Sequence, residues 1–470
     1  IGIQHPDHTG PATIRYRDIG DYLTREQKLD ILTTATLDDD TAWEPITPND
    51  HGDWLNRRDN TYQAFTPIGT KDAEPAIFTV YSNGLKTNRD AWCYNFRHAL
   101  VEHNMRAMID TYNESLECPL PDDPTRISWN RSLLKDHDRG IARTFQPTGI
   151  RPALYRPFTK QTAYFDRTLN DMVYRMPSIF PTANTPNVGF LVISPHPQAK
   201  FSVLATDLLP DCATYVITSQ FFPRWTYEPA ARRAQIDELF SLDEGEVVDG
   251  WRRVDNITDH ALAQYRAAFG HQVTKDDIFS CVYAVLHSPT YRAQYEADLR
   301  KMLPRIPLAS SVDEFHAFTD AGRRLLDLHI GYETVEPYPL QESIQAPVDL
   351  SDADLYRVVK KMRYPKHGSH TDRSTLIYND HITLHGIPDQ AHDYQLGSRS
   401  ALDWIIDRYW IRTDKPSGIV NDPNNPTNPR HILDLIKRVT TVSVETMRII
   451  RALPSVRESN SAIRRDRMQP

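Results

Sequence analysis

The glycines of this chain form no pattern that binds a phosphate group or a nucleotide cofactor. Its 470 residues include 18 glycines, yet no two of them are separated by a single residue. That absence excludes the G-x-G-x-x-G fingerprint of dinucleotide-binding domains and a glycine-rich loop for S-adenosylmethionine. The sequence also lacks G-x-x-x-x-G-K-[ST], so it has no P-loop for ATP.

Other catalytic motifs are missing as well. No two prolines are adjacent, which excludes the N-P-P-Y type of tetrapeptide with which amino-methyltransferases hold a flipped base. The motifs G-x-S-x-G, H-E-x-x-H and C-x-x-C are also absent. We therefore expect neither a catalytic residue nor a metal site in this chain.

Cysteine is scarce, and long apolar runs are lacking. Four cysteines, Cys93, Cys118, Cys212 and Cys281, lie far apart and match no zinc or redox spacing. Free thiols are typical of a reducing cytoplasm, and no apolar run approaches the ~18 residues of a membrane span. The opening Ile1 follows no initiator Met and no signal-like segment. We therefore expect a cytoplasmic protein without membrane contact, and a chain that was cut from a longer polypeptide.

A positive balance is also lacking, since the formal net charge is −8. Proteins that bind nucleic acid are usually basic, but binding depends on where the charges lie. Residues 126–175 hold ten basic and four acidic side chains, a balance of +6, and residues 357–373 hold six and one, a balance of +5. Each run alone is also explained by a solvated surface. Two such runs on an acidic chain favour a nucleic-acid partner.

The pattern of elements indicates a mixed α+β protein of several modules. Short strands are predicted at 12–16, 76–81, 151–165, 188–193, 201–204 and 214–219, with a turn at 82–84 and a hairpin joining 375–378 to 381–384. Helices are predicted from Thr24 as an N-cap, at 96–112, within 258–300, after Ser311, at 401–409 and at 432–453. Without regular βαβ alternation, we expect short sheets and helical bundle segments but no complete Rossmann-like domain. The predicted core includes Trp404, Ile405, Tyr409, Val439, Val442, Val444 and Ile449.

Two weaker patterns have ordinary structural explanations. Asp18 or Asp21 with the Glu26-Gln27-Lys28 segment faintly resembles the carboxylates of a metal-dependent nuclease, but a solvated helix start explains the segment better. The histidines 367, 370, 381 and 385 could gather a metal, but strand positions around a hairpin explain them better.

Several phrases in this order resemble one family. They include RYRDIGDYL at 15–23, YSNGLKTNRDAW at 81–92, RPALYRPF at 151–158 and GSRSALDW at 397–404, with further matches near 286–307, 417–424 and 441–446. From about residue 14 to 454 the chain is similar to the C-terminal portion of type I single-polypeptide (type ISP) restriction–modification enzymes. Members of that family carry nuclease, helicase-like ATPase, coupler, adenine-N6 methyltransferase and target-recognition domains on one polypeptide.

The resemblance implies an organisation of the chain and a set of partners. Residues 1–115 would be the trailing part of the methyltransferase domain and its junction, and 116–235 the first part of the target-recognition module. An acidic linker or excursion at 236–257, a helical segment at 258–340, a distal recognition module at 341–453 and a polar tail at 454–470 would follow. S-adenosylmethionine, ATP and Mg would bind elsewhere in the full-length enzyme, with no cofactor in this segment. Double-stranded DNA and the upstream methyltransferase, ATPase and nuclease domains would be its partners.

Residues able to contact DNA come from the basic runs and from the resembling phrases. Phosphate contacts position a protein on DNA, whereas contacts with base edges select the sequence. The candidates are Lys86, Thr87, Asn88, Arg89, Arg156, Lys160, Arg167, Arg175, Lys360, Lys361, Arg363, Lys366, Ser398 and Arg399. Structural alternatives exist for several of these residues. Arg89 could pair with Asp90, Arg156 could be buried against Asp166, and Lys360 to Lys366 could lie on a solvated face. A helix cap by Ser400 with Asp403 would explain the segment of Ser398 and Arg399.

Two functions of different kinds remain after these exclusions. The first is DNA sequence recognition, with modules 116–340 and 341–453 forming one side of a groove around the duplex. The alternative is a scaffold, in which the helices at 258–330 dock the methyltransferase or the motor and contact DNA little. The missing motifs argue against a free-standing nuclease or hydrolase.

Overall fold

The structure, a computed structural model, divides into two units at residue 58. It describes residues 9–456 except for 11, 20–22, 35, 37–42, 49–51, 55–59, 73, 119, 231–245 and 369. The first unit is Ile1–Arg58 and the second is Asp59–Pro470. The second unit contains every predicted DNA contact.

The first unit contains one helix and two short strands. Strand β1 (Ile14–Tyr16) pairs antiparallel with β2 (Glu44–Ile46), and α1 (Arg25–Thr34) lies between them in the sequence. The Thr24 amide donates to Gln27 Oε1 at 2.8 Å, and the Gln27 amide donates to Thr24 Oγ1 at 3.3 Å. This reciprocal cap confirms the predicted helix start. Glu26 and Lys28 lie on that helix, whereas Asp21 lies outside the described residues.

A four-stranded sheet separates the two hydrophobic cores of the second unit. Its order is β4 (Ser82–Asn83), β11 (Ser219–Pro223), β8 (Gly189–Ile193) and β9 (Val203–Thr206). Successive residues of β8 alternate between the cores: Leu191 packs in one, and Phe190 and Val192 in the other. Since a strand presents alternate side chains to opposite faces, burial on both faces accounts for the uninterrupted apolar run at 188–193.

The first core lies between a second sheet and the C-terminal helices. This sheet has the order β10 (Leu209–Pro210), β6 (Ile150–Arg156), β7 (Thr159–Tyr164) and β5 (Tyr94–Asn95). The β6–β7 hairpin confirms the short strands predicted at 151–165. Four helices also contribute side chains to this first core: α2 (Asp90–Cys93), α3 (His98–Glu117), α4 (Arg131–His137) and α5 (Met176–Ile179).

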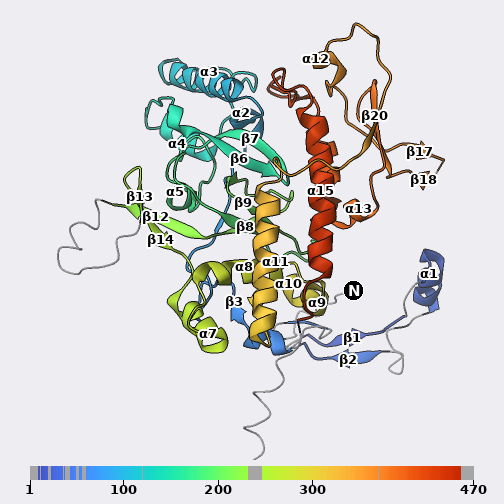
Figure 1. The fold of residues 1–470 in the computed structure, drawn as a ribbon. Coiled ribbons are helices and arrows are strands. Elements are labelled where there is room, and N and C mark those ends of the chain that lie inside the picture. Colours follow the sequence, from blue (N-terminus) through green and yellow to red (C-terminus); the bar gives the residue numbers. More distant parts are fainter. Residues whose placement is uncertain are drawn as a thin grey trace, which may run out of the picture. The chain divides into compact units, whose positions relative to one another are not determined.

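The second core is mostly helical. It contains residues of α7 (Asp259–Phe269), α8 (Lys275–Val285), α9 (Pro289–Gln294), α10 (Glu296–Leu299) and α11 (Val312–Ile330). Gly322 of α11 packs directly on the carbonyl of Ser280, where a Cβ would lie 1.9 Å from that oxygen. Figure 1 shows α11 beside α15 (His431–Arg451), and His329 and Thr446 join the two helices through a 2.9 Å hydrogen bond.

A small antiparallel sheet follows strand β11 of the first four-stranded sheet along the chain. Strand β12 (Trp225–Pro229) pairs with β14 (Trp251–Asp255), which also pairs with β13 (Val247–Val248). The predicted acidic excursion thus includes two strands, and its residues 236–245 lie outside the described ones. Another pair, β3 (Thr66–Pro67) with β15 (Arg305–Ile306), connects the start of this unit to the stretch between α10 and α11.

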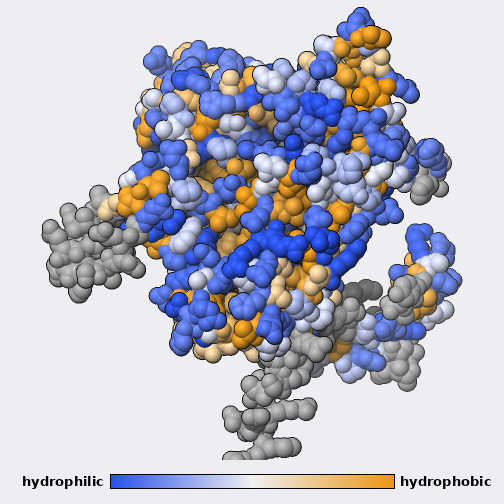
Figure 2. Space-filling model, viewed as in Figure 1, coloured by the Kyte–Doolittle hydropathy of each residue, from blue (hydrophilic) through white to orange (hydrophobic). Residues whose placement is uncertain are grey.

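The distal part of the chain is built from short hairpins around α14 and α15. Strand β20 (Ile382–His385) lies between β16 (Gln341–Ile344) and β19 (Thr375–Ile377), which confirms the predicted hairpin. The remaining elements are α12 (Asp352–Leu355), β17 (Lys366–His367), β18 (His370–Thr371), α13 (Gln390–Asp393), β21 (Gln395–Leu396), β22 (Arg399–Ser400), α14 (Ala401–Arg408), β23 (Arg412–Thr413) and β24 (Val420–Asn421). Apolar side chains gather on the part that carries α12 (Figure 2), where Ile344, Val348 and Val359 are exposed.

The mixed α+β class is confirmed, but two strand predictions are wrong. Residues 76–81 form only one isolated bridge, Phe78 to Ile257, and the predicted turn at 82–84 contains strand β4. The strand placed at 214–219 begins only at Ser219, because 214–218 form a loop. The predicted core residues are buried except Val444, which is partly exposed. Within the described part of the chain, no helix combines the length and hydropathy that a membrane span needs.

Candidate nucleic-acid interface

Three loops of the second unit lie side by side and form one surface. The amides of Lys86 and Met172 each donate to the other's carbonyl, at 2.9 and 3.0 Å. The Cys212 amide donates to the Leu85 carbonyl at 2.9 Å, and the Leu85 amide to the Pro210 carbonyl at 2.7 Å. The loops 84–89, 167–175 and 211–218 are thus joined by their backbones, and together they are named the loop surface.

The loop surface exposes apolar side chains on an unusual backbone. Met172, Tyr174 and Val216 are among the exposed large hydrophobic residues of the chain. Asn88, Tyr174 and Val216 have φ angles of +53°, +45° and +66°. A positive φ is uncommon for any residue with a side chain and costs most for a β-branched one, and such strain is concentrated at functional sites. Each of the three loops contributes one of these residues.

Cations surround this apolar centre. Lys86 pairs with Asp171 at 2.9 Å, and this hydrogen bond raises the pKa of the lysine. Arg167 and Arg175 are exposed, and neither has a carboxylate within ion-pair distance among the described residues. Two unneutralised guanidinium groups beside exposed apolar side chains form a surface suited to an anionic polymer with apolar faces, such as DNA.

A groove of about 860 Å³ continues from the loop surface through Tyr174 and Arg175. Lys71, Asn83 and Gln220 also line it. The Gln220 amide donates to the side chain of Asn83, and to Ser194 Oγ at 3.3 Å. Asn and Gln side chains can pair with adenine edges. The sequence did not reveal Lys71, Asn83, Tyr174 or Gln220, because only the fold brings these separate segments to one groove.

Two predicted contacts of the first loop are buried. Thr87 donates its hydroxyl to Asp90, which also accepts from the Tyr155 hydroxyl at 2.9 Å. Arg89 is only 4% exposed, and its guanidinium lies against Met108 and forms no ion pair with the described Asp90, so the suggested Arg89–Asp90 pair is wrong. Its Nη1 lies 3.7 Å from Met108 Sδ, while Nε and Nη2 have no hydrogen-bond partner in the part of the chain that the structure describes. Burial lowers the pKa of this guanidinium.

Arg156 is also buried, against a carboxylate that the sequence did not indicate. Its Nη1 donates to Asp211 at 2.9 Å, and its Nη2 lies 3.9 Å from Asp90. The suggested partner Asp166 instead accepts the amides of Thr168 and Leu169, each at 2.8 Å. Arg156 therefore fastens β6 to the start of loop 211–218.

In the distal part, the fold brings Lys361 and Arg399 to one carboxylate. Lys361 Nζ and Arg399 Nη1 each lie 2.7 Å from a different oxygen of Asp407. Arg408 and Arg412, which the sequence did not single out, pair with the same carboxylate at 3.1 and 3.7 Å. These four cations and Asp407 are named the Asp407 cluster.

Ser398 and Ser400 have different roles. The Ser400 hydroxyl accepts the Asp403 amide at 3.2 Å, and Asp403 in turn accepts the Ser400 amide, which confirms the predicted helix cap. Ser398 is exposed on the turn at Gly397. A Cβ on Gly397 would lie 3.6 Å from Tyr215, so this turn adjoins the loop surface.

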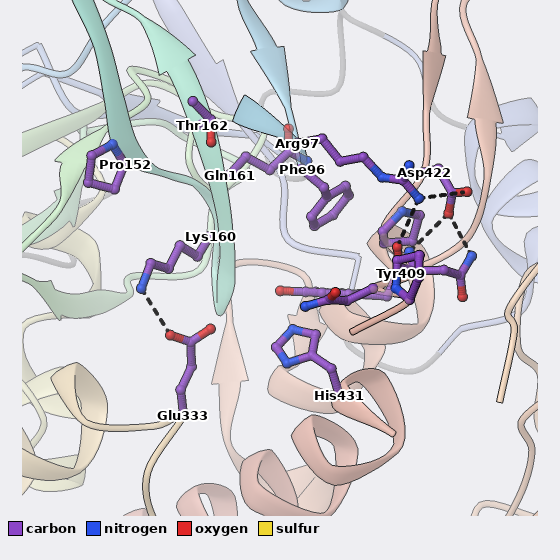
Figure 3. Close-up of a pocket in the computed structure, with 14 residues that line it drawn as sticks. Phe96, Arg97, Pro152, Lys160, Gln161, Thr162, Glu333, Tyr409, Asp422 and His431 are labelled. Carbon is purple, nitrogen blue, oxygen red and sulfur yellow. Dashed lines mark hydrogen bonds and ion pairs between the residues drawn. The ribbon is translucent and has the colours of Figure 1, made fainter. Parts of the chain in front are cut away.

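The remaining candidates are exposed, and several are ion-paired. Lys160 pairs with Glu333 at 3.1 Å beside a pocket of about 460 Å³ that also contains Arg97 and Asp422 (Figure 3). Lys360 pairs with Asp380 at 3.1 Å. Arg363 and Lys366 are exposed without a carboxylate partner among the described residues. Acids distant in the sequence thus neutralise part of each basic run.

Metal-ligating side chains do not converge in the described ranges. No group of three or more His, Cys, Asp or Glu residues there could hold a metal ion. The four cysteines are free thiols, and burial raises the pKa of Cys93 to about 12.

A specificity module, meaning a domain that selects a DNA sequence, is the class of protein that this fold and surface define. The family model of the Type ISP C-terminal specificity domain matches residues 76–435, and the chain belongs to this family. Among curated proteins, none matches the chain.

Three similar solved structures are of larger enzymes. One is a nuclease-deletion mutant of the Type ISP restriction-modification enzyme LlaGI in complex with a DNA substrate mimic, with 36% identity, a TM-score of 0.76 and coverage of 95% of this chain and 40% of that one. Another is the ATP-dependent Type ISP enzyme LlaBIII bound to DNA, with 32% identity, a TM-score of 0.79 and coverage of 95% and 28%. The third is a DrdV–DNA complex, with 32% identity, a TM-score of 0.78 and coverage of 94% and 43%. The chain therefore spans less than half of each relative.

Proposed function

We propose that this chain recognises the DNA target sequence for a restriction–modification enzyme that methylates adenine N6 and cleaves DNA with ATP. The observation that carries the proposal is the loop surface, where Tyr174 and the exposed Arg175 line a groove together with Asn83 and Gln220, and where Arg167 is exposed on the same loop as Arg175. The DNA-bound state of the relatives LlaGI, LlaBIII and DrdV supports the same partner.

The two kinds of side chain would divide the task. Arg167, Arg175 and Lys86 are placed to hold phosphates, which fixes the register of the protein on the duplex. The Asn83 and Gln220 amides and the exposed Asn88 are of the type that selects bases. Because Thr87, Arg89 and Arg156 are buried, we assign them to the support of this surface rather than to direct contact.

The rest of the enzyme would supply the chemistry. We infer that residues 1–115 are the trailing part of a methyltransferase domain and its junction with the recognition part, a junction that includes the loop 84–89. Residues 116–235 and 341–453 would be recognition modules joined by the helical segment 258–340. S-adenosylmethionine, ATP and Mg would bind in the upstream methyltransferase, ATPase and nuclease domains. This chain would hold the duplex while the target adenine rotates out of the base stack into the active site of the methyltransferase domain. Such an enzyme would act in the bacterial cytoplasm.

The scaffold alternative has less support from the helices that it invokes. All residues from Ile278 to Val285 of α8 are buried within this chain. The apolar face of α11 packs in the same core, with Phe315, Phe318 and Leu325 buried. These faces are already covered, which leaves little apolar surface on α8 and α11 for docking another domain.

The salt dependence of duplex binding distinguishes the two functions. A protein that contacts Z phosphates releases counterions, so log K falls with log[salt] with a slope of about −0.9Z. We expect the purified chain to bind a duplex with a slope steeper than about −3. Absence of binding at low salt, in a chain that unfolds cooperatively, would favour the scaffold.

A further inference from the structure

The Asp407 cluster has more positive charge than its own acid can balance. The side chains of Lys361, Arg399 and Arg412 are 50%, 37% and 36% exposed, and Arg408 beneath them is 14% exposed. All four point to the one carboxylate of Asp407, so the cluster has a net charge of +3. Like charges held this closely repel one another unless an anion joins them.

The hydrogen-bond donors of the cluster also indicate that it can accept an anion. Among the described residues the buried Nε group of Arg412 has no hydrogen-bond acceptor, whereas the Nε group of Arg408 lies 3.1 Å from the Asp407 carboxylate. Burial is the main cause that lowers the pKa of Arg408 to about 10, and repulsion from Arg156 is the next largest cause. An uncompensated buried donor is costly to a folded protein, and a phosphate oxygen is a strong acceptor for a guanidinium group. The cluster is therefore short of acceptors as well as of negative charge.

The cluster is connected to the loop surface through side chains. The Arg408 guanidinium lies 5.9 Å from the centre of the Tyr155 ring, and Tyr155 donates to Asp90 at 2.9 Å. Asp90 also accepts from Thr87 in the loop 84–89. An anion that bridged the cluster and the loop surface would be a polymer of phosphates rather than a single ion.

We propose that the Asp407 cluster is a phosphate-binding site that holds one backbone phosphate of the duplex. Lys361, Arg399 and Arg412 contact the phosphate, and Asp407 is a positioning residue that holds the three cations together. This site rests on the proposed DNA-recognition function and adds Arg408, Arg412 and Asp407 to it. Because a backbone phosphate carries no sequence information, the site contributes affinity and register but no base preference.

The test compares Lys361→Ala, Arg399→Ala and Arg412→Ala, singly and combined in one triple variant, with the wild-type chain in salt titrations of duplex binding. The triple variant, which loses all three contacts to the one phosphate, is expected to make the salt slope shallower by about 0.9, and each single variant by part of that. Every variant should weaken its binding to selected and to random duplexes by the same factor. Arg448→Ala on α15 is the matched control, since Arg448 is 61% exposed and pairs with a single acid, Glu445. Thermal unfolding of each variant, with Arg399→Lys and Arg412→Lys as conservative forms, separates loss of contact from loss of fold.

Duplexes with single neutral methylphosphonate linkages then locate the contact. Neutralising one backbone position should weaken the wild-type chain but not the triple variant. If the variants keep the wild-type slope, or if no linkage behaves in this way, the cluster is not a backbone site. If the wild-type chain itself binds no duplex, it is the proposed DNA-recognition function that fails.

Discussion

The guanidinium of Arg156 lies 2.9 Å from the carboxylate of Asp211, and both side chains are buried. Arg156 ends strand β6, and Asp211 begins the loop 211–218. Strand β10, which pairs parallel with β6, ends at Pro210 directly before Asp211. The backbone therefore connects β6 to the same loop as the ion pair does. One ion pair thus fixes part of the loop surface to the second sheet.

Arg156→Ala should destabilise the fold rather than remove a DNA contact. The substitution leaves a buried, uncompensated carboxylate, which typically costs about 3–5 kcal/mol. Urea denaturation measures the loss. Arg167 is exposed and has no ion pair with a described residue, so Arg167→Ala should change stability by less than about 0.5 kcal/mol. If Arg156→Ala keeps wild-type stability but loses DNA binding, Arg156 contacts the duplex directly.

Exposed arginines of the loop surface should act on binding alone. Arg167→Ala and Arg175→Ala are each expected to weaken duplex binding and to make the salt slope shallower by about 0.9, with an unchanged unfolding midpoint. Arg300→Ala, at the C-cap of α10, is a suitable control, because Arg300 is 45% exposed and pairs with Glu296. Equal effects of all three substitutions would show that only overall charge matters.

The buried histidines should make stability depend on pH. Burial lowers the pKa of His329 to about 3 and also places that of His287 well below its usual value. Because the unfolded chain binds these protons near pH 6.5, the stability is complete above that pH and is lost as pH falls towards the folded pKa. Each group contributes up to about 1.4 kcal/mol per pH unit below 6.5.

Denaturant unfolding at pH 7.5, 6.5 and 5.5 measures this loss before most carboxylates titrate. The variant His329→Gln should be less stable at pH 7.5, because Thr446 and Tyr283 lose a well-placed partner. Its free energy of unfolding should nevertheless fall less steeply between pH 6.5 and 5.5, because the variant takes up about one proton fewer on unfolding. An unchanged slope would mean that His329 takes up no proton on unfolding.

Ser400→Ala should destabilise the start of α14. Loss of an N-cap hydroxyl costs about 0.5–2 kcal/mol, and this hydroxyl accepts the Asp403 amide. The neighbouring Ser398→Ala is the control, since Ser398 is exposed and lies outside the cap. Similar losses in both variants would indicate that the turn, and not the cap, determines the stability.

Features set by neighbouring residues could be predicted from the sequence, whereas features set by distant residues could not. The caps at Thr24, Ser311 and Ser400 and the hairpin around Asn379 each depend on a few consecutive residues. The partners of Arg156 and Lys361 lie 55 and 46 residues away, so only the fold identifies Asp211 and Asp407. Strand β4 has two residues and was mistaken for a turn, because Asn and Gly are typical turn residues.

For the candidate site, the sequence identified exposed cations but not their surroundings. Lys86, Asn88, Arg167 and Arg175 lie on the loop surface, although nothing in their spacing indicated that the loops meet. Thr87, Arg89 and Arg156 were selected by residue type, and residue type does not reveal burial. Arg408 and Arg412 lie outside both basic runs, so charge counting missed them.

Selection of bound duplexes from a randomised pool, at low and at physiological salt, tests the central claim most directly. The purified chain should enrich an asymmetric motif that contains adenine, and the double variant Arg175→Ala with Gln220→Ala should weaken or alter that enrichment. Binding without any enriched sequence, by a chain that is folded at both salt concentrations, would contradict the assignment of specificity to this chain.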